Sequence, residues 1–467
     1  MSSKPGELRS RPAMAAAAAM LLVVAACVGP VSSISPSTSP AGRSSAAAPV
    51  FGSSAPSTIG AASVAPVATM DLENLPAAPN GAWKGIRWAE LSTSPMVALQ
   101  TPAPSISVGT LDSADIVAGW SRGYVSLLTQ VVTPPDTYFQ GTATIATTYS
   151  SDGVHWHSGN VLQQQIASDN LKIIEVYEGP SGLLAVGESG ACGTGWIEAL
   201  WTSRDGIAWQ KVDTKKAFGK ATIENVSGGS SGFVATDQTG HAVWTSLDGQ
   251  SWRPVNLNAS TFAHSRIDDG TAISGGYVLA GSTQLIGARS CGGLVYDPSV
   301  RPTPTPPQLM PAVWWSADGV TWTKSQLPGA TSAVSIQMTV CRVNDRTVIA
   351  FVNQSDSLWI TNDGRTWTAS AQLSTALAQP SGLSRFGLLT DGRHGILVGS
   401  SHTNPNNAWN VSDISMVNDD GTLANLAQSG VTPPYGGAGT DANVRWVVGP
   451  TGILAIGEST LWIGLPS

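Results

Sequence analysis

Few residues in this sequence have the types and spacing that catalysis or metal binding needs. The six histidines are scattered, and no His/Cys spacing matches that of a zinc site. Asp419 and Asp420 are adjacent, but one turn with two carboxylates falls short of the roughly six to eight oxygens that calcium takes. No Gly-x-Ser-x-Gly elbow, phosphate loop or dinucleotide fingerprint stands out. The sequence therefore predicts no catalytic residue, no metal site and no cofactor.

Aspartates do recur at a fixed spacing, in the phrase Ser/Thr-x-Asp-Gly-x-x-Trp. The hydroxyl, carboxylate and indole positions of its five copies are Ser150, Asp152 and Trp156; Ser203, Asp205 and Trp209; Ser246, Asp248 and Trp252; Ser316, Asp318 and Trp322; and Thr361, Asp363 and Trp367. The hydroxyl and carboxylate can hydrogen-bond to turn backbone groups. Asp-Gly between apolar runs predicts a two-residue type I′ hairpin turn, which the tryptophan of the outgoing strand can cover.

Further strands must accompany each hairpin. The incoming strand often carries a tryptophan four residues before the aspartate, at Trp201, Trp244, Trp314 and Trp359. Upstream lies a strand introduced by glycine, as in residues 181–188 and 451–458, and before it another apolar stretch, as in residues 173–176. Four-stranded antiparallel units that repeat in this way are typical of β-propeller blades.

The repeats predict an all-β, seven-bladed β-propeller of four-stranded antiparallel blades, closed by an N-terminal strand. Five blades have clear hairpins, and a sixth keeps the turn at residues 418–423 without the tryptophan. A seventh starts near Val444 and ends at residues 461–464 without its outer strand. Residues 83–91 reproduce an outgoing strand with Trp88 in the tryptophan register. Pairing this strand with the last blade would cover an exposed sheet edge.

The repeated phrase resembles the Asp-box (BNR) repeat, and the resemblance covers most of the chain from Asp152 to Asp363. That family includes sialidases, sortilin-type receptors, a photosystem assembly factor and some glycanases. Its usual spacing is Ser-x-Asp-x-Gly-x-x-Trp, one residue longer than here, which weakens a sialidase-specific inference. The family places these turns at the periphery, away from the axis, which makes their carboxylates poor catalytic candidates.

The resemblance also sets out what a sialidase would require. Such an enzyme needs three arginines that grip a carboxylate, a Tyr/Glu nucleophile pair and an acidic aspartate. The sequence has no Arg-Ile-Pro element near the first blade. Arg266 is the single arginine that suggests a functional residue on a strand, and a solvated charge at a connection between blades explains it better.

The N-terminal 80 residues predict export and anchoring. Residues 1–26 combine a basic start with a short apolar run, as signal peptides do, and residues 24–27, Val-Ala-Ala-Cys, resemble the lipobox of bacterial lipoproteins. That resemblance implies a lipid on Cys27; the alternative is an ordinary Ala-x-Ala cleavage site followed by a chance cysteine. Residues 27–80 read as a disordered Ser/Ala/Pro-rich tether with an r.m.s. span on the order of 40 Å. Residues 81–467 then form the propeller.

The charge content narrows the classes of binding partner, and the cysteines indicate a disulfide. Charged residues make up 12% of the chain, the net charge is −7, and no Lys/Arg stripe is present, so we expect no nucleic acid partner. Export favours a disulfide, for which Cys192 and Cys291 are the expected pair because both fall in long loops on one face of the ring. Cys341 is expected to be a buried strand thiol.

Three long loops between second and third strands are the candidate ligand-binding face. They span residues 190–198, 283–310 and 401–409 and carry Trp196, Tyr296 and Trp409, which either stack on sugar rings or pack the loops onto the body. Residues 301–307 are Pro-rich and read as a spacer in preference to a polyproline ligand.

These features predict a monomeric, extracytoplasmic β-propeller, anchored to the bacterial cell membrane through Cys27. Its expected role is a binding or scaffold module for a glycan or protein at the cell envelope. The alternatives are a sialidase-like glycoside hydrolase and a structural or sensory module without a small ligand.

Overall fold

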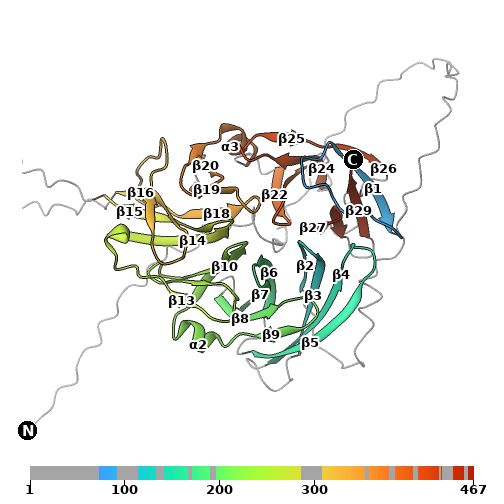
Figure 1. The fold of residues 1–467 in the computed structure, drawn as a ribbon, viewed down its shortest axis with the longest axis horizontal. Coiled ribbons are helices and arrows are strands. Elements are labelled where there is room, and N and C mark those ends of the chain that lie inside the picture. Colours follow the sequence, from blue (N-terminus) through green and yellow to red (C-terminus); the bar gives the residue numbers. More distant parts are fainter. Residues whose placement is uncertain are drawn as a thin grey trace, which may run out of the picture.

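The strands form seven separate sheets arranged in a ring, viewed along its axis in Figure 1. This computed structural model describes residues 73–91, 114–132, 141–166, 171–189, 196–285, 308–352, 357–377, 384–402, 409–430, 433, 445–456 and 461–467. Six sheets have four antiparallel strands in sequence order, and the seventh has five. The predicted seven-bladed β-propeller is therefore confirmed.

The first three blades contain twelve strands. They are β2 (Ala114–Trp120), β3 (Gly123–Val132), β4 (Gly141–Ser150) and β5 (His157–Ile166); β6 (Leu171–Gly179), β7 (Gly182–Ser189), β8 (Trp196–Ser203) and β9 (Trp209–Lys211); and β10 (Ile223–Gly229), β11 (Gly232–Asp237), β12 (Val243–Ser246) and β13 (Arg253–Pro254). Each blade begins with its inner strand and ends with its outer strand (Figure 1).

The next three blades follow the same plan. They are β14 (Ser265–Ile273), β15 (Gly276–Gln284), β16 (Leu309–Ser316) and β17 (Thr323–Ser325); β18 (Met338–Arg342), β19 (Val348–Val352), β20 (Leu358–Thr361) and β21 (Thr368–Ala369); and β22 (Ser384–Thr390), β23 (Gly395–His402), β24 (Trp409–Val417) and β25 (Leu423–Asn425). The described helices are short: α2 (Thr214–Phe218), η3 (Ser260–Phe262) and α3 (Ala371–Leu377). None of the helices in the described ranges has the length and hydropathy of a membrane span.

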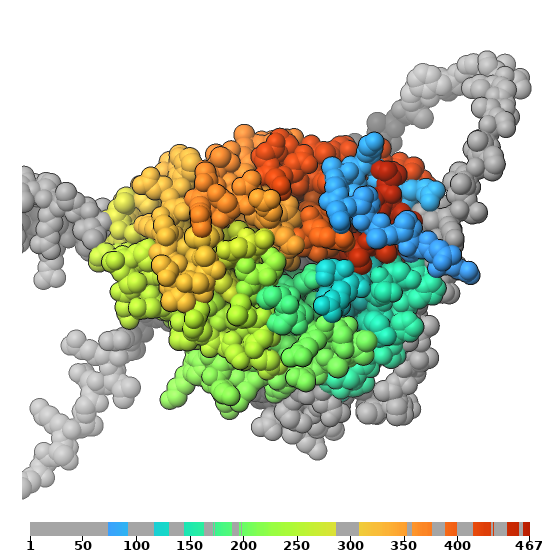
Figure 2. Space-filling view, in the orientation of Figure 1, coloured from blue at the N-terminus to red at the C-terminus, as the bar shows by residue number. Residues whose placement is uncertain are grey.

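The seventh blade is assembled from distant parts of the chain. Strands β27 (Arg445–Val448), β28 (Ile453–Ile456) and β29 (Leu461–Pro466) are joined by β1 (Gly85–Leu91), which runs antiparallel to β29. On its other side β1 pairs in parallel with β26 (Ala427–Gly430), an arrangement that the sequence did not predict. Figure 2 shows the blue N-terminal residues lying against the red C-terminal blade. The predicted closure by an N-terminal strand is confirmed.

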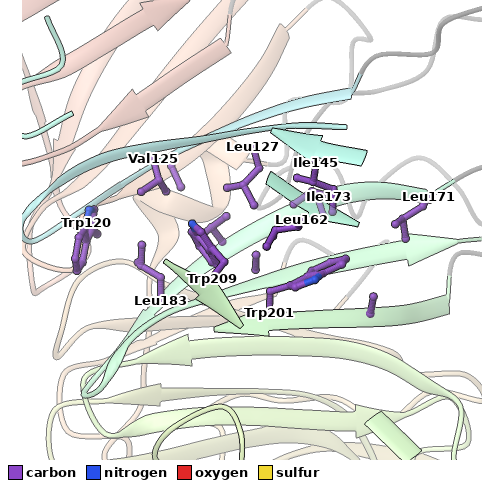
Figure 3. Packing of buried hydrophobic residues seen from close by; sticks show 14 residues of the cluster. Trp120, Val125, Leu127, Ile145, Leu162, Leu171, Ile173, Leu183, Trp201 and Trp209 are labelled. Atoms are coloured by element: carbon purple, nitrogen blue, oxygen red, sulfur yellow. The ribbon is translucent and has the colours of Figure 1, made fainter. Parts of the chain in front are cut away.

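Apolar side chains fill the space between neighbouring blades. In Figure 3, Val125 and Leu127 of the first blade face Leu183 and Trp201 of the second, and Trp201 is only 1% exposed. Both faces of an internal blade are covered in this way, which explains why the strands are continuously apolar. Burial of a side chain of this size contributes about 1.5–3 kcal/mol, so packing between blades stabilises the ring.

The Asp-Gly turns have a different geometry from the predicted type I′ turn. That turn needs positive φ at both central residues, but His264 is the single non-glycine residue with positive φ in the described ranges. At the second blade, Asp205 Oδ1 instead accepts hydrogen bonds from the backbone N–H groups of Ile207 and Ala208, both at 2.9 Å. The loop is therefore wider, with its aspartate outside the left-handed region, and the two-residue prediction is wrong.

The hydroxyl and tryptophan positions that recur in the phrase complete these loops. The Ser or Thr hydroxyl donates to the aspartate at 3.0–3.2 Å in all five copies. In four copies the tryptophan Nε1 donates to the glycine carbonyl three residues earlier; Trp322 is the exception. Turn donors and acceptors are thus satisfied by side chains within the loop.

One cysteine prediction is corrected. Cys341 lies on β18, is 5% exposed and is disulfide-bonded, so it is not a free thiol. A buried position on a strand does not distinguish a small apolar thiol from a bonded sulfur. The expected partners in a disulfide, Cys192 and Cys291, lie outside the described residues.

Candidate functional site at the ring axis

A cavity of about 260 Å³ lies at the end of the axis where first and second strands are joined. Five blades contribute to it through these turns. Its lining residues are Trp120, Ser121, Arg122, Glu178, Gly179, Pro180, Gly182, Ser230, Arg342, Asp345, Asp391 and Arg393. Three arginines and three carboxylates thus border a space the size of a small ligand.

Arg342 occupies the centre of this group. It ends the inner strand β18, its side chain is 10% exposed, and its Nη1 lies 3.5 Å from Asp345 Oδ1. A Cβ added to Gly229 of the third blade would lie 3.3 Å from that Nη1 and 1.8 Å from the Ala272 carbonyl oxygen, so only glycine fits there. Burial lowers the pKa of Arg342, while nearby acidic groups oppose that change. The guanidinium nevertheless stays charged.

Glu178 connects the first two blades at the rim of the cavity. Its Oε2 accepts from the Ser121 backbone N–H at 3.1 Å, and its Oε1 accepts from the Ser121 hydroxyl. Burial raises the pKa of Glu178, and the hydrogen bonds from Ser121 only partly counter this effect. Burial also raises the pKa of Asp345.

Asp391 organises the turn of the sixth blade. Its carboxylate accepts from the backbone N–H groups of Arg393 and His394 at 2.8 and 2.7 Å, and both side chains reach its Oδ2 at 3.2 Å. Burial alone would raise the pKa of Asp391, but hydrogen bonds from His394 and Arg393 outweigh it and hold the pKa below its usual value. His394 Nε2 lies 2.9 Å from the Pro79 carbonyl oxygen, which fixes the segment before β1.

A second layer of ionisable groups lies further along the inner strands. Glu175 and Tyr177 are on β6, and Asp268 and Asp269 are on β14. Both strands have a β-bulge next to these residues, between Ile173 and Glu175 and between Ile267 and Asp269. A bulge changes which side chains of a strand face the partner, and here it coincides with polar residues in otherwise apolar strands.

The aspartates of this layer join the fourth and fifth blades. Asp268 Oδ2 accepts from the Met338 backbone N–H and Asp269 Oδ2 from that of Val340, both at 3.0 Å. Burial raises the pKa of Asp268 to about 6 and that of Asp269 to about 7. It likewise raises the pKa of Glu175 to about 7. These carboxyl groups can therefore gain or lose a proton near neutral pH.

Two of the three predicted ligand residues, Trp196 and Trp409, lie at the ends of the strands opposite the cavity. Trp196 begins β8 and is 46% exposed, and Trp409 begins β24. Tyr296 falls outside the described residues, as does Cys27. Arg266 is half-exposed, and its Nε lies 3.2 Å from Asp268 Oδ1, so it pairs with the second layer of ionisable groups without entering the cavity.

The sequence did not predict the residues that line the axial cavity or the second layer of ionisable groups. One signal was present: the first strands of three successive blades share the pattern Ile-x-polar, at Ile173 and Glu175, Ile223 and Asn225, and Ile267 and Asp269. Each of these patterns coincides with a register shift. Arg342 and Asp391 belong to no such pattern. In the part of the chain that the structure describes, no three His, Cys, Asp or Glu side chains form a group that would hold a metal ion.

No protein-family model and no curated protein matches the chain. Among solved structures, a glycosyl hydrolase from Bacteroides ovatus is 12% identical, with a TM-score of 0.25 over 62% of this chain and 94% of its own. The parainfluenza virus 5 hemagglutinin-neuraminidase ectodomain is 9% identical, with a TM-score of 0.29 over 78% and 84%. Cobalt-substituted ACO from Synechocystis is 10% identical, with a TM-score of 0.25 over 70% and 64%. Scores this low carry no argument about function.

Proposed function

We propose that this protein is an extracytoplasmic propeller of the Asp-box type that binds a glycan or protein ligand at the cell envelope. A lipid on Cys27 would hold it at the membrane, and residues 27–80 would separate the ring from the lipid surface. The five side-chain-bonded turns support the Asp-box assignment, and residues 1–27 support export and anchoring. We expect the protein to act as a monomer.

The observation that carries a binding role is how the axial carboxylates are used. Asp268 and Asp269 accept backbone N–H groups of the next blade, and Glu178 accepts from Ser121. Asp391 accepts four hydrogen bonds within its own turn. Groups committed to holding the ring together are poorly suited to act as acid, base or nucleophile, because catalysis would break these contacts. A rigid ring around a polar cavity suits binding.

Binding and anchoring can be tested on the full chain and its Cys27→Ser variant. We expect the native chain in the membrane fraction with a lipid-dependent mass shift, and the variant in the soluble fraction. The purified variant should retain at least one glycan on an array, or one envelope component in a cross-linked pull-down. Equal membrane association of both proteins would contradict the lipid anchor, and a blank result in both binding assays would contradict the binding role.

A glycoside hydrolase is the second candidate, and one observation favours it. Glu175 and Asp269 both have pKa values raised to about 7, and both interact electrostatically with Tyr177. A protonated carboxyl near a tyrosine is a possible acid for bond cleavage. A panel of fluorogenic glycosides decides between the candidates. Turnover that Glu175→Gln or Asp269→Asn abolishes, while Glu90→Gln leaves it intact, would replace the binding role by a hydrolase.

A further inference from the structure

We propose that the axial cavity binds a zwitterion, specifically the ammonium and carboxylate groups of a free α-amino acid. This inference goes beyond the proposed function, because it concerns the end of the ring opposite the long loops and a ligand that is neither a glycan nor a protein. Three charged side chains, Arg342, Asp345 and Glu178, line the space that such a ligand would occupy.

The Arg342 guanidinium is short of acceptors. It has five N–H donors, and its contact with Asp345 Oδ1, at 3.5 Å, is the single hydrogen bond that it makes with described residues. Its side chain is nine-tenths buried and lines the cavity, and none of its nitrogens is among the buried, unpartnered atoms of the described residues, so its free donors remain accessible to a ligand. A ligand carboxylate would satisfy two donors at once in a bidentate pair.

Asp345 has capacity left for a cation. Its carboxylate makes only the same 3.5 Å contact among the described residues, and its side chain is 46% exposed and lines the cavity. Burial raises the pKa of Asp345, which an approaching ammonium group would reverse. Arg342 and Asp345 therefore form a long, incomplete ion pair, and each partner can bind the opposite charge of a ligand.

These charged groups converge on one point. A Cβ placed on Gly392 would lie 3.1 Å from Asp345 Oδ1, 3.6 Å from Glu178 Oε2 and 3.8 Å from Arg342 Nη1. The positive and negative groups are thus a few ångströms apart, which is the separation that an α-amino acid presents. Gly392 leaves this point open because it has no side chain.

The charge balance of the cavity favours a ligand without net charge over a simple ion. Arg122, Arg342 and Arg393 formally cancel Glu178, Asp345 and Asp391. A dianion such as phosphate would meet three carboxylates, and a cation would meet three guanidinium groups. A neutral zwitterion meets neither penalty. Trp120 and Pro180 supply an apolar wall for a side chain, and about 260 Å³ leaves room for a single small or medium residue.

The test uses the full-length Cys27→Ser chain and isothermal titration calorimetry. The probes are L-alanine and L-leucine, with N-acetyl-L-alanine lacking the ammonium group, L-alaninamide lacking the carboxylate, and inorganic phosphate and D-glucuronate as anions. We expect saturable binding of at least one amino acid and at least tenfold weaker binding of the blocked forms and both anions. Equal binding of a blocked form, tighter binding of either anion, or no binding of either amino acid would overturn the inference.

Variants locate the site. Asp345→Asn and Arg342→Gln should each weaken amino-acid binding at least tenfold, whereas Arg346→Gln, an exposed arginine one residue from Asp345 and outside the cavity, should leave it unchanged. Asp345 is half-exposed, so its variant tests the site even if Arg342→Gln fails to fold. Unchanged binding in Asp345→Asn would place the amino acid elsewhere and refute the axial site. If the chain binds no amino acid but still binds a glycan or protein, the proposed function stands and only the axial amino-acid site is refuted.

Discussion

The hydroxyl group of Tyr124, on the second strand of the first blade, donates a hydrogen bond of 3.0 Å to the carbonyl of Gly452 in the last blade. The same hydroxyl lies 2.9 Å from Thr451 Oγ1, which in turn donates to the Asp152 carbonyl. Tyr124 is fully buried, so these contacts are shielded from water. They join the two ends of the ring on the face that carries the Asp-Gly turns.

Tyr124→Phe should lower the free energy of unfolding by about 0.5–1.5 kcal/mol, because it removes one of the two hydrogen bonds that the buried Gly452 carbonyl accepts. Urea unfolding followed by tryptophan fluorescence measures the change. Tyr149→Phe is the matched control, since Tyr149 is only partly buried and packs between the first two blades. A Tyr124→Phe protein as stable as the native chain would show that this bond contributes nothing to ring closure.

Trp88→Ala should cost about 3–5 kcal/mol, because it removes a large side chain that is 2% exposed in the closing strand. Trp196→Ala removes the same side chain from a position that is 46% exposed and should cost little. Thermal unfolding of the two variants compares the positions. Deletion of residues 81–94 should lower the melting temperature further, and an unchanged value would contradict the role of β1 in closure.

Asp205→Ala should destabilise the second blade by about 1–2 kcal/mol, because two backbone N–H groups lose their acceptor. Hydrogen exchange should increase at Ile207 and Ala208 and leave β14 protected. Glu90→Ala, an exposed carboxylate on β1, serves as the control. Unchanged exchange at the turn would indicate that serine and tryptophan suffice to hold it.

Stability should fall as the pH rises from about 5 to 8. Burial raises the pKa of Glu175 and Asp269 to about 7, so folding favours their protonated forms. Their contribution to stability is complete below the unfolded pKa of about 4 and is lost as the pH rises through 7, by roughly 3–4 kcal/mol for each group. Glu175→Gln should flatten this slope, and Glu90→Gln should not. Chemical denaturation at several pH values measures the free energy of unfolding. If it fell equally with pH in Glu175→Gln and in the native chain, Glu175 would not be the source of the pH dependence.

The opposite dependence is expected below about pH 4. Hydrogen bonds from backbone N–H groups lower the pKa of Asp318 to about 2 and hold that of Asp205 below its usual value. A lowered pKa favours the charged form in the folded state, so its contribution is present above pH 4 and is lost as the pH falls. Acid unfolding monitored by circular dichroism should begin in this range, and Asp205→Asn should shift its midpoint.

The ring was predictable from the sequence because the repeated phrase recurs in five blades and the strands around it recur in the others. The closure of the ring was predictable as well, because residues 83–91 resemble the strand that the last blade lacks. The exact turn was misjudged: Asp-Gly adjacency favours a type I′ turn, but the Ser203 hydroxyl and Asp205 carboxylate bond to N–H groups of a wider loop. Local propensity was overridden by side-chain hydrogen bonds.

The axial site could not be predicted in the same way. Glu178, Arg342 and Asp391 come from different blades and follow no common spacing, and only closure of the ring brings them together. The sequence does show single polar residues within the inner strands. A stretch such as Ile174-Glu175-Val176, however, indicates an apolar strand and gives no sign that Glu175 belongs to a site. The parallel pairing of β26 with β1 was equally hidden, because no motif marks it.

The split last blade affects the order in which the chain can fold. Trp88 Nε1 bonds to Gln428 across 340 residues, and the main partner of β1 lies later still. During synthesis the strands of the other six blades are therefore made before the antiparallel partner of β1. Contacts this distant in sequence slow folding, because the long intervening loop must close first. Until β29 is available, β1 lacks its antiparallel partner, and its open edge can pair with other strands.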